Sequence, residues 1–310
     1  MSMHNRIKDR GKERVEKVMK LTEKTIIGFI GIGVMGTSMV RHLLHGGYTV
    51  YVYTRTKEKA NAVIAEGAQW CETAKEVAQQ ADVIMTMVGY PHDVEEVYFG
   101  EDGLLQVAKE EAIVIDFTTS TPTLAKRIYE EGKKKKVHAL DAPVSGGDIG
   151  AKEGRLTIMV GGDEEVYSAC LPLFKLLGGN IILQGAAGSG QHTKMCNQIT
   201  IASNMIGVCE AVAYAKKAGL DPEKVLQSIS AGAAGSWSLS NLAPRMLKED
   251  FAPGFYVKHF IKDMKIALDE AEKLQLAVPG LTLAKQLYDE LAAEGEENSG
   301  TQALYKQYIK

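Results

Sequence analysis

Lys194 is the residue whose setting in this sequence most strongly suggests chemistry. Between positions 193 and 215 only one other charged residue occurs, Glu210. If this segment is helical, Asn197 and Gln198 lie one turn further on, on the same face as the lysine. A carbonyl that is reduced by hydride becomes an alkoxide, which requires a proton donor and a positive field. A lysine whose pKa is lowered by burial supplies both, so Lys194 is a candidate general acid and base.

Neighbouring residues leave alternatives to this interpretation. Asn197 can orient either the lysine or a substrate oxygen by a hydrogen bond. A lysine near the end of an apolar helix can also snorkel toward water, and this structural alternative stays open. His192 is a rival acid or base because its pKa is near neutral, although a histidine in the first turn of a helix is more typical of a cap or a surface group.

The chain has four cysteines, and none of them forms a CxxC pair or a Cys/His cluster with zinc spacing. We therefore expect reduced thiols and no metal site. Core packing is the expected role of Cys196, because free cysteine is usually buried. The other three are Cys71, Cys170 and Cys209.

A glycine-rich turn follows the first apolar segment, the predicted strand Thr25–Ile30. Its GxGxxG pattern, between a strand and a helix, is typical of a dinucleotide site. The first glycine permits a tight turn, the second lets the backbone approach a pyrophosphate, and the third allows close helix–strand packing. The N-terminus of the following helix offers free N–H groups to the phosphates. The predicted cofactor loop consists of Gly31, Ile32, Gly33, Val34, Met35 and Gly36.

The end of the second predicted strand, Tyr48–Tyr53, indicates which nicotinamide cofactor is bound. NAD enzymes usually place an acidic residue there for the ribose 2′-OH, but none occurs between positions 36 and 58. An arginine can instead pair with a 2′-phosphate. The sequence therefore favours NADP(H), with NAD(H) as the alternative, and a solvated surface is the other interpretation of the basic side chains. The residues expected at this position are Thr54, Arg55, Thr56 and Lys59.

The segment DAPVSGG, at positions 141–147, directly follows another predicted strand. It therefore lies at the carboxyl end of the sheet, where ligands bind in open α/β folds. Ser145, Gly146 and Gly147 expose consecutive backbone N–H groups, which suit a carboxylate. A flexible glycine turn is the equally simple alternative.

Short apolar segments that alternate with helical patterns position these motifs in the first part of the chain. Repeated β-α-β units predict a parallel sheet with helices on both faces. The predicted helices lie near 34–44, 57–66, 73–80, 92–98, 122–132 and 164–177. Beyond the first two strands, the predicted strands are Val83–Val88, Ile113–Phe117, Val137–Leu140, Leu156–Val160 and Ile181–Leu183.

After residue 190 no segment resembles a strand, and a long helical pattern from 191 to 218 leads into further helices. These are expected near 223–229, 238–248, 260–274 and 280–293. The predicted fold is α/β, with an N-terminal Rossmann-type doubly wound sheet that a long helix joins to an all-α C-terminal domain. The expected division is a charged extension over 1–24, an NAD(P)-binding domain over 25–187, and a helical substrate and dimerisation domain over 188–310.

Composition and charge exclude several classes of protein. A chain of 310 residues suggests two domains at about 150 residues each. With 36 basic and 39 acidic residues the net charge is −3, which argues against nucleic-acid and membrane partners. No segment reaches the roughly 18 uncharged apolar residues of a membrane span. Residues 1–24 lack the apolar run of a secretory signal and carry acids that transit peptides avoid. A cytoplasmic protein is expected.

Together these motifs resemble the β-hydroxyacid dehydrogenase family, which includes 3-hydroxyisobutyrate dehydrogenases and tartronate semialdehyde reductases. The resemblance extends over about residues 25–305. The segments that carry it occur in the family's order: the cofactor loop GFIGIGVMG (28–36), the substrate signature DAPVSGG (141–147), the catalytic segment GSGQHTKMCNQ (188–198) and the lysine-containing segment FYVKHFIKDMKIAL (255–268).

The resemblance implies a role for individual residues. It places the catalytic lysine on Lys194, its partner on Asn197, and a second functional lysine, which approaches cofactor and substrate, on Lys262. A solvated lysine is the structural alternative for Lys262. Ser145, Gly146 and Gly147 would hold the substrate carboxylate.

Other implied contacts lie on neighbouring loops. Val88 and Gly89 would contact the cofactor, and Thr119 would lie near its nicotinamide. Trp237 is a candidate for the pocket wall, although a core or interface tryptophan is equally compatible with the sequence. One departure is Gln198, where the family often has a second asparagine after the lysine; this changes pocket packing rather than the acid/base assignment.

We therefore expect an oxidoreductase that transfers hydride between NADP(H) and a short β-hydroxy carboxylate/semialdehyde pair. Two alternatives stay open: a non-catalytic NADP-binding oligomeric module, and an enzyme of the 6-phosphogluconate dehydrogenase type. The many small residues of the long helix favour close interhelical packing in a homodimer or homotetramer.

Overall fold

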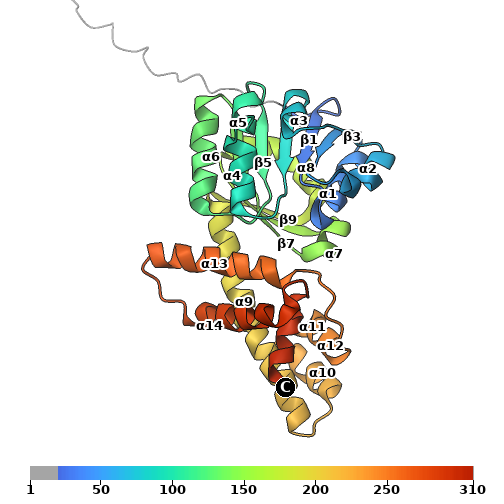
Figure 1. Ribbon diagram of the computed structural model, residues 1–310, viewed down its shortest axis with the longest axis vertical. Coiled ribbons are helices and arrows are strands. Elements are labelled where there is room, and N and C mark those ends of the chain that lie inside the picture. The colour runs from blue at the N-terminus through green and yellow to red at the C-terminus, as the bar shows by residue number, and fades with distance from the viewer. Residues whose placement is uncertain (1–19, 310) are drawn as a thin grey trace, which may run out of the picture.

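A computed structural model describes residues 20–309, so most of the predicted extension over 1–24 lies outside the described residues. The chain forms a sheet-containing domain followed by a helical domain (Figure 1). Helix α9 (Ser189–Lys217) starts beside the sheet and runs through the helical domain, which makes it part of both. This arrangement confirms the predicted fold class.

The sheet contains nine strands within the described residues, in the order β3-β2-β1-β4-β5-β6-β8-β7, with β9 paired to β8. The first six follow the doubly wound Rossmann order, in which β1 lies at the point where the strand order reverses. The strands are β1 (Ile26–Ile30), β2 (Thr49–Tyr53), β3 (Gln69–Trp70), β4 (Val83–Thr86), β5 (Ile113–Asp116), β6 (His138–Asp141), β7 (Val144–Ser145), β8 (Leu156–Gly161) and β9 (Gly178–Gly185).

The predicted parallel sheet contains antiparallel pairs at one end. β8 pairs antiparallel with both β6 and β7, whereas β9 pairs parallel with β8. Only the six-residue helix α7 (Gly147–Lys152) and a turn separate β7 from β8. A parallel crossover needs a dozen or more residues, so this short connection returns the chain antiparallel.

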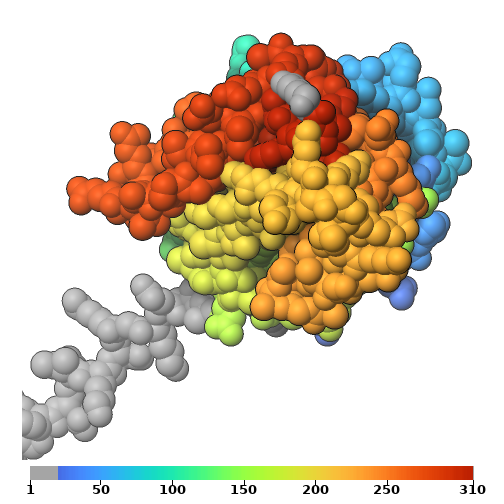
Figure 2. Space-filling model, turned by 90° about the horizontal axis from the view of Figure 1, so that it is seen from below, coloured from blue at the N-terminus to red at the C-terminus, as the bar shows by residue number. Residues whose placement is uncertain are grey.

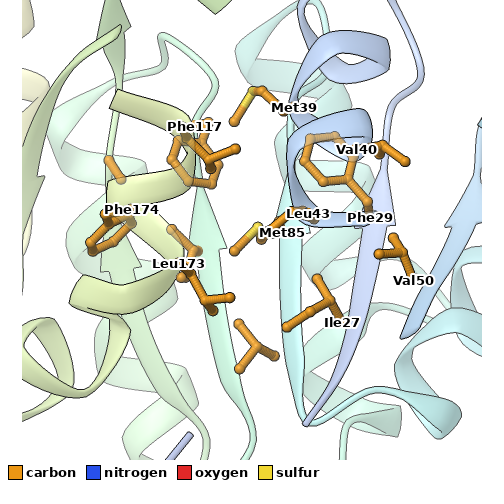
Figure 3. Close-up of a cluster of buried hydrophobic side chains, with 14 of the residues drawn as sticks. Ile27, Phe29, Met39, Val40, Leu43, Val50, Met85, Phe117, Leu173 and Phe174 are labelled. Carbon is orange, nitrogen blue, oxygen red and sulfur yellow. The ribbon is translucent and has the colours of Figure 1, made fainter. Parts of the chain in front are cut away.

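Helices cover both faces of the sheet, which leaves its central strands buried on both sides. On one face, side chains of α1 and α8 meet the strand side chains between them (Figure 3). This cluster includes Ile27, Phe29, Met39, Val40, Leu43, Met85, Phe117, Leu173 and Phe174. The opposite face is covered by a second cluster from α3, α4 and α6.

The helices of the first domain follow the predicted alternation, with α5 and α7 as additions that were too short to predict. They are α1 (Val34–His45), η1 (Lys57–Ala60), α2 (Asn61–Ala65), α3 (Ala74–Gln80), α4 (Pro91–Phe99), α5 (Leu104–Val107), α6 (Pro122–Lys134), α7 (Gly147–Lys152) and α8 (Glu164–Leu177).

The other helices of the second domain pack against α9, and Figure 2 shows this domain from its far end. The predicted helix over 238–248 is two short helices, because Pro244 has no N–H with which to continue the first. Besides α9, the helical segments are α10 (Pro222–Ser230), α11 (Trp237–Asn241), α12 (Ala243–Leu247), α13 (Val257–Lys273), α14 (Pro279–Leu291), η2 (Ala292–Glu296) and η3 (Thr301–Tyr308).

α13 is the helix of this domain that faces the sheet (Figure 1), and it contacts the sheet domain directly through Lys262. No helix within residues 20–309 is both long enough and apolar enough to cross a lipid bilayer.

Candidate active site

The three glycines of the loop between β1 and α1 occupy three different environments. Gly31 has a φ of +102°, and a Cβ there would collide with the carbonyl oxygen of Met87. A Cβ at Gly36 would collide with the carbonyl oxygen of Gly31, so these two positions require glycine for packing. Gly33 has no atom within 4 Å of the position of a Cβ. The open space therefore lies at Gly33, directly before the first residue of α1.

The N-terminus of α1 is open to a ligand as well. Its N-cap is Gly33, and no side chain caps the helix. Val34 is exposed and Met35 is half-buried, whereas the side chain of Ile32 is in the core. Only backbone groups of Ile32 are thus available to a ligand. Uncapped N–H groups at a helix N-terminus form an anion site.

The residues predicted to bind the 2′-phosphate follow β2 and lie at the same edge of the sheet as the glycine loop. Thr54 is half-buried, whereas Arg55, Thr56 and Lys59 are exposed. Arg55 is not simply solvated: its Nη1 lies 2.9 Å from Oδ1 of Asp93 in the first turn of α4. Sequence reasoning did not identify this ion pair.

The loops after β4 and β5 are joined to each other and to the second domain. The backbone N–H of Val88 donates to Oγ1 of Thr118 at 2.9 Å, and half-buried Gly89 follows. The Nζ of Lys262 donates to the carbonyl oxygen of Thr119 at 2.8 Å. Since β1, β4 and β5 are neighbours, the structure brings the predicted cofactor loops together at the carboxyl edge of the sheet.

Lys194 is buried at the start of α9, with 6% of its surface exposed. Its Nζ donates to the carbonyl oxygen of Val144 at 2.9 Å. Burial lowers the pKa of Lys194 from 10.5 to about 8; the nearby Asp263 carboxylate raises this pKa, and Lys262 lowers it further. The snorkelling alternative is thereby excluded, because the ammonium points into the protein rather than toward water.

A buried polar network accompanies Lys194 on α9 and α13. Asp263 pairs with the Nζ of Lys262 at 2.9 Å and accepts a 2.6 Å hydrogen bond from Nε2 of Gln198. Oε1 of Gln198 in turn accepts a 2.7 Å bond from Nδ2 of Asn197. Asn197, the predicted partner of the lysine, thus bonds to Gln198, and no hydrogen bond among the described residues joins it to Lys194.

The start of α9 is fixed to the sheet by two residues that sequence reasoning did not single out as functional. The Asp141 carboxylate accepts the backbone N–H groups of Gly188 at 2.7 Å and Gln191 at 2.8 Å. The Gln191 side chain donates to the carbonyl oxygen of Thr118 and accepts the backbone N–H of Ser120. Lys194 is therefore held against the sheet by contacts from β6 and from the loop after β5.

Ser145, Gly146 and Gly147 lie next to the carbonyl that Lys194 contacts. Ser145 ends β7, and Gly146, with a φ of +130°, is the N-cap of α7. Gly147 has a φ of +63°, so both glycines adopt conformations that other residues rarely take. The predicted acid, Lys194, therefore contacts the residue directly before the predicted carboxylate site.

Three other residues do not join this group. Trp237 is 62% exposed at the start of α11, which excludes a core role, and no hydrogen bond or ring contact among residues 20–309 links its side chain to Lys194 or Lys262. His192 is half-buried. The expectation that Cys196 packs in the core was wrong, since it is exposed, whereas the other three free cysteines are buried. Within the same residues, no three His, Cys, Asp or Glu side chains could hold a metal ion.

Each half of the chain matches the profile of a known protein family. Residues 26–185 match the profile described as the NAD binding domain of 6-phosphogluconate dehydrogenase. Residues 188–308 match that of the NAD-binding domain of NADP-dependent 3-hydroxyisobutyrate dehydrogenase.

Curated relatives cover nearly the whole chain. The uncharacterized oxidoreductase YkwC of Bacillus subtilis is 66% identical over 287 residues, which are 93% of this chain and 100% of the relative. The 2-hydroxy-3-oxopropionate reductase of Escherichia coli is 41% identical over 278 residues, covering 90% of this chain and 95% of the relative.

Solved structures match over a similar length. The 3-hydroxyisobutyrate dehydrogenase of Mycobacterium tuberculosis, with L-serine, superposes with a TM-score of 0.84 at 30% identity, over 92% of this chain and 99% of that one. Psf3 in complex with NADP+ and 2-OPP has a TM-score of 0.85 at 26% identity, over 92% and 100% of the two chains.

Proposed function

This chain belongs to the β-hydroxyacid dehydrogenase family, and from that premise we propose that it transfers hydride between NADP(H) and a short β-hydroxy carboxylate/semialdehyde pair. The family makes it an NAD(P)-dependent oxidoreductase of the 3-hydroxyisobutyrate dehydrogenase type. The NADP(H) preference, the acid/base residue and the substrate class are the parts that we propose.

The loop between β1 and α1 fits a dinucleotide. Gly33 leaves open space beside the uncapped N–H groups of α1, which would hold the pyrophosphate. Arg55 would pair with the 2′-phosphate of the ribose, with Thr54, Thr56 and Lys59 beside it. Bound there, the nicotinamide supplies or accepts the hydride.

The buried ammonium of Lys194 is the observation that carries the proposed chemistry. With a pKa of about 8 it is protonated at neutral pH yet gives up its proton readily. In the reductive direction Nζ donates a proton to the substrate oxygen, where negative charge develops. In the oxidative direction neutral Nζ accepts the hydroxyl proton. The bond to the Val144 carbonyl holds Nζ in position for both.

Ser145, Gly146 and Gly147 would hold the substrate carboxylate through backbone N–H groups and the serine hydroxyl. Lys262 is a second cation near Lys194, and it approaches from α13 while bonded to the Thr119 carbonyl. Asn197 would orient the substrate oxygen beside Lys194. In this arrangement the sheet domain would hold the carboxylate, α9 would supply the acid, and α13 would supply the second lysine.

Other parts of the proposal concern the assembly. We assign cofactor binding to residues 25–187, and substrate binding and dimerisation to residues 188–310. Trp237, exposed in one chain, would line the pocket wall. A homodimer or homotetramer in the cytoplasm is the expected form.

The proposal is tested with NADPH and short aldehydes that carry a carboxylate, each compared with an aldehyde of equal length that lacks it. We expect turnover only with the carboxylates, and its loss in Lys194→Met but not in Lys265→Met, an exposed lysine of α13. NADPH binding without turnover of any aldehyde would support a non-catalytic module. In a parallel assay with NADP+ and hydroxy acids, turnover confined to phosphorylated hydroxy acids would support a 6-phosphogluconate dehydrogenase type.

A further inference from the structure

The ion pair between Arg55 and Asp93 crosses the mouth of the cofactor site. β1 lies between β2 and β4, with Ile30 in register with both Tyr53 and Thr86. Arg55 follows the end of β2, and Asp93 lies in α4, after β4. Their 2.9 Å contact therefore spans the carboxyl end of β1, where the glycine loop begins.

The two partners differ in how firmly they are held. The Arg55 side chain is 80% exposed, so its guanidinium is free to change partner. Asp93 is 7% exposed, and its Oδ2 accepts the backbone N–H of Tyr90 at 3.0 Å. Its Oδ1 faces Arg55 and, at 3.8 Å, Nε2 of His92. The carboxylate is thus held by the backbone of its own helix, whereas the guanidinium is open to solvent.

We propose that Asp93 competes with the 2′-phosphate for Arg55 and so sets how strongly this protein distinguishes NADP(H) from NAD(H). This inference rests on the proposed role of Arg55 as the 2′-phosphate ligand. Asp93 is a specificity-determining residue that acts through Arg55, and it needs no contact with substrate or with the reacting atoms.

The direction of the effect follows from the charges. When Arg55 pairs with the phosphate, it leaves Asp93 without its cation and with a second anion close by. Binding of NAD(H) leaves the pair intact, because no 2′-phosphate draws the guanidinium away. Asp93 therefore weakens NADP(H) binding selectively. The effect is modest, because the guanidinium of Arg55 is largely exposed and water screens its interaction with Asp93.

The test measures NADP+ and NAD+ affinities by calorimetry, independently of turnover. Asp93→Asn keeps an oxygen acceptor for the Tyr90 N–H while removing the charge. We expect it to tighten NADP+ binding about threefold and to leave NAD+ binding within twofold. Glu95→Gln is the matched control, because it removes another carboxylate of α4, one that pairs with Arg127 at 2.5 Å, and should change neither affinity.

Arg55→Ala separates this inference from the proposed function. If it weakens NADP+ at least tenfold and spares NAD+, Arg55 binds the phosphate, and in that background Asp93→Asn should change NADP+ affinity by less than twofold. If Arg55→Ala affects both cofactors equally, the proposed NADP(H) preference itself fails.

Several results would overturn the inference while leaving Arg55 in its proposed role. Unchanged or weaker NADP+ binding in Asp93→Asn is one, and equal tightening of both cofactors is another. Asp93→Ser, with a hydroxyl acceptor, provides the same comparison if the asparagine variant does not fold. Thermal unfolding of each variant checks that α4 is intact.

Discussion

Lys194 and Arg55 are cations at opposite ends of one sheet edge, and their surroundings differ in nearly every respect. Lys194 is buried and tied to the Val144 carbonyl, and burial lowers its pKa to about 8. Arg55 is largely exposed and rests on the fixed carboxylate of Asp93. In the proposed function, desolvation and fixed contacts would control the protonation state of Lys194 at the buried end. Exchange of Arg55 between anions at the exposed end would control only cofactor binding.

The largest effect is expected from Asp263→Asn. The carboxylate is buried beside Lys262 and Gln198, and it also acts on nearby Lys194. Its loss leaves the two lysines close together without this counter-charge. We expect a loss of about 3–5 kcal/mol in the free energy of unfolding, measured in urea. The pKa of Lys194 should fall further, because Asp263 raises it, and the pH profile of the reaction should shift toward acid.

Asp269→Asn on the same helix α13 is the matched control. Asp269 is exposed and pairs with Lys265 at 2.9 Å. Its loss should change the free energy of unfolding by less than about 1 kcal/mol and leave the pH profile unchanged. Equal effects of the two substitutions would contradict the contrast between buried and exposed charges.

A second prediction concerns stability and pH. Below pH 8 Lys194 is protonated in both the folded and the unfolded chain. The free-energy cost of removing its charge from water then destabilises the folded state. Between about pH 8 and 10.5 the lysine is neutral only when folded, so stability rises with pH. Relative to Lys194→Met, the wild type should gain about 3 kcal/mol across this range.

Urea unfolding of both proteins from pH 7 to 10.5 measures this difference, in which the titration of other groups cancels. The difference in stability between wild type and Lys265→Met, which removes an exposed lysine but keeps Lys194, should not change with pH. A constant difference between wild type and Lys194→Met would mean that the lysine is solvated.

The smallest of these effects is expected from Asp141→Asn. An amide has one oxygen with which to accept the N–H groups of Gly188 and Gln191, so one of the two bonds is lost. We expect a loss of about 1–2 kcal/mol in the free energy of unfolding. The start of α9 carries Lys194, so kcat should fall while NADP+ affinity stays the same. A fall in cofactor affinity without a change in kcat would refute this role in positioning the lysine.

Local patterns were enough to predict the glycine loop and the sheet that presents it. The spacing of Gly31, Gly33 and Gly36 encodes a turn within a few residues, so the sequence alone indicates it. Lys194 could likewise be identified from the sequence alone, because few charged residues surround it in the helical pattern. The two-residue strands β3 and β7 could not be predicted, because they are too short to show a period.

The contacts that tune the site could not be read from the sequence. Asp93 meets Arg55, and Asp263 meets Gln198, only because distant segments converge in the fold. Cys196 was misplaced for a related reason. α9 is apolar on most sides, so its pattern does not reveal which side faces outward. A conspicuous residue is therefore easier to identify in a sequence than the partners that determine its behaviour.

The most direct test of the central claim is the pH dependence of kcat/KM for NADPH-driven reduction, in wild type and Lys194→Met. If Lys194 donates the proton, the wild-type rate is level at low pH and falls above about pH 8 as the lysine loses its proton. The variant should bind NADPH within twofold of wild type, turn over about 10²–10⁴-fold more slowly, and lack this limb. A variant that keeps both the rate and the limb near pH 8 would contradict the account.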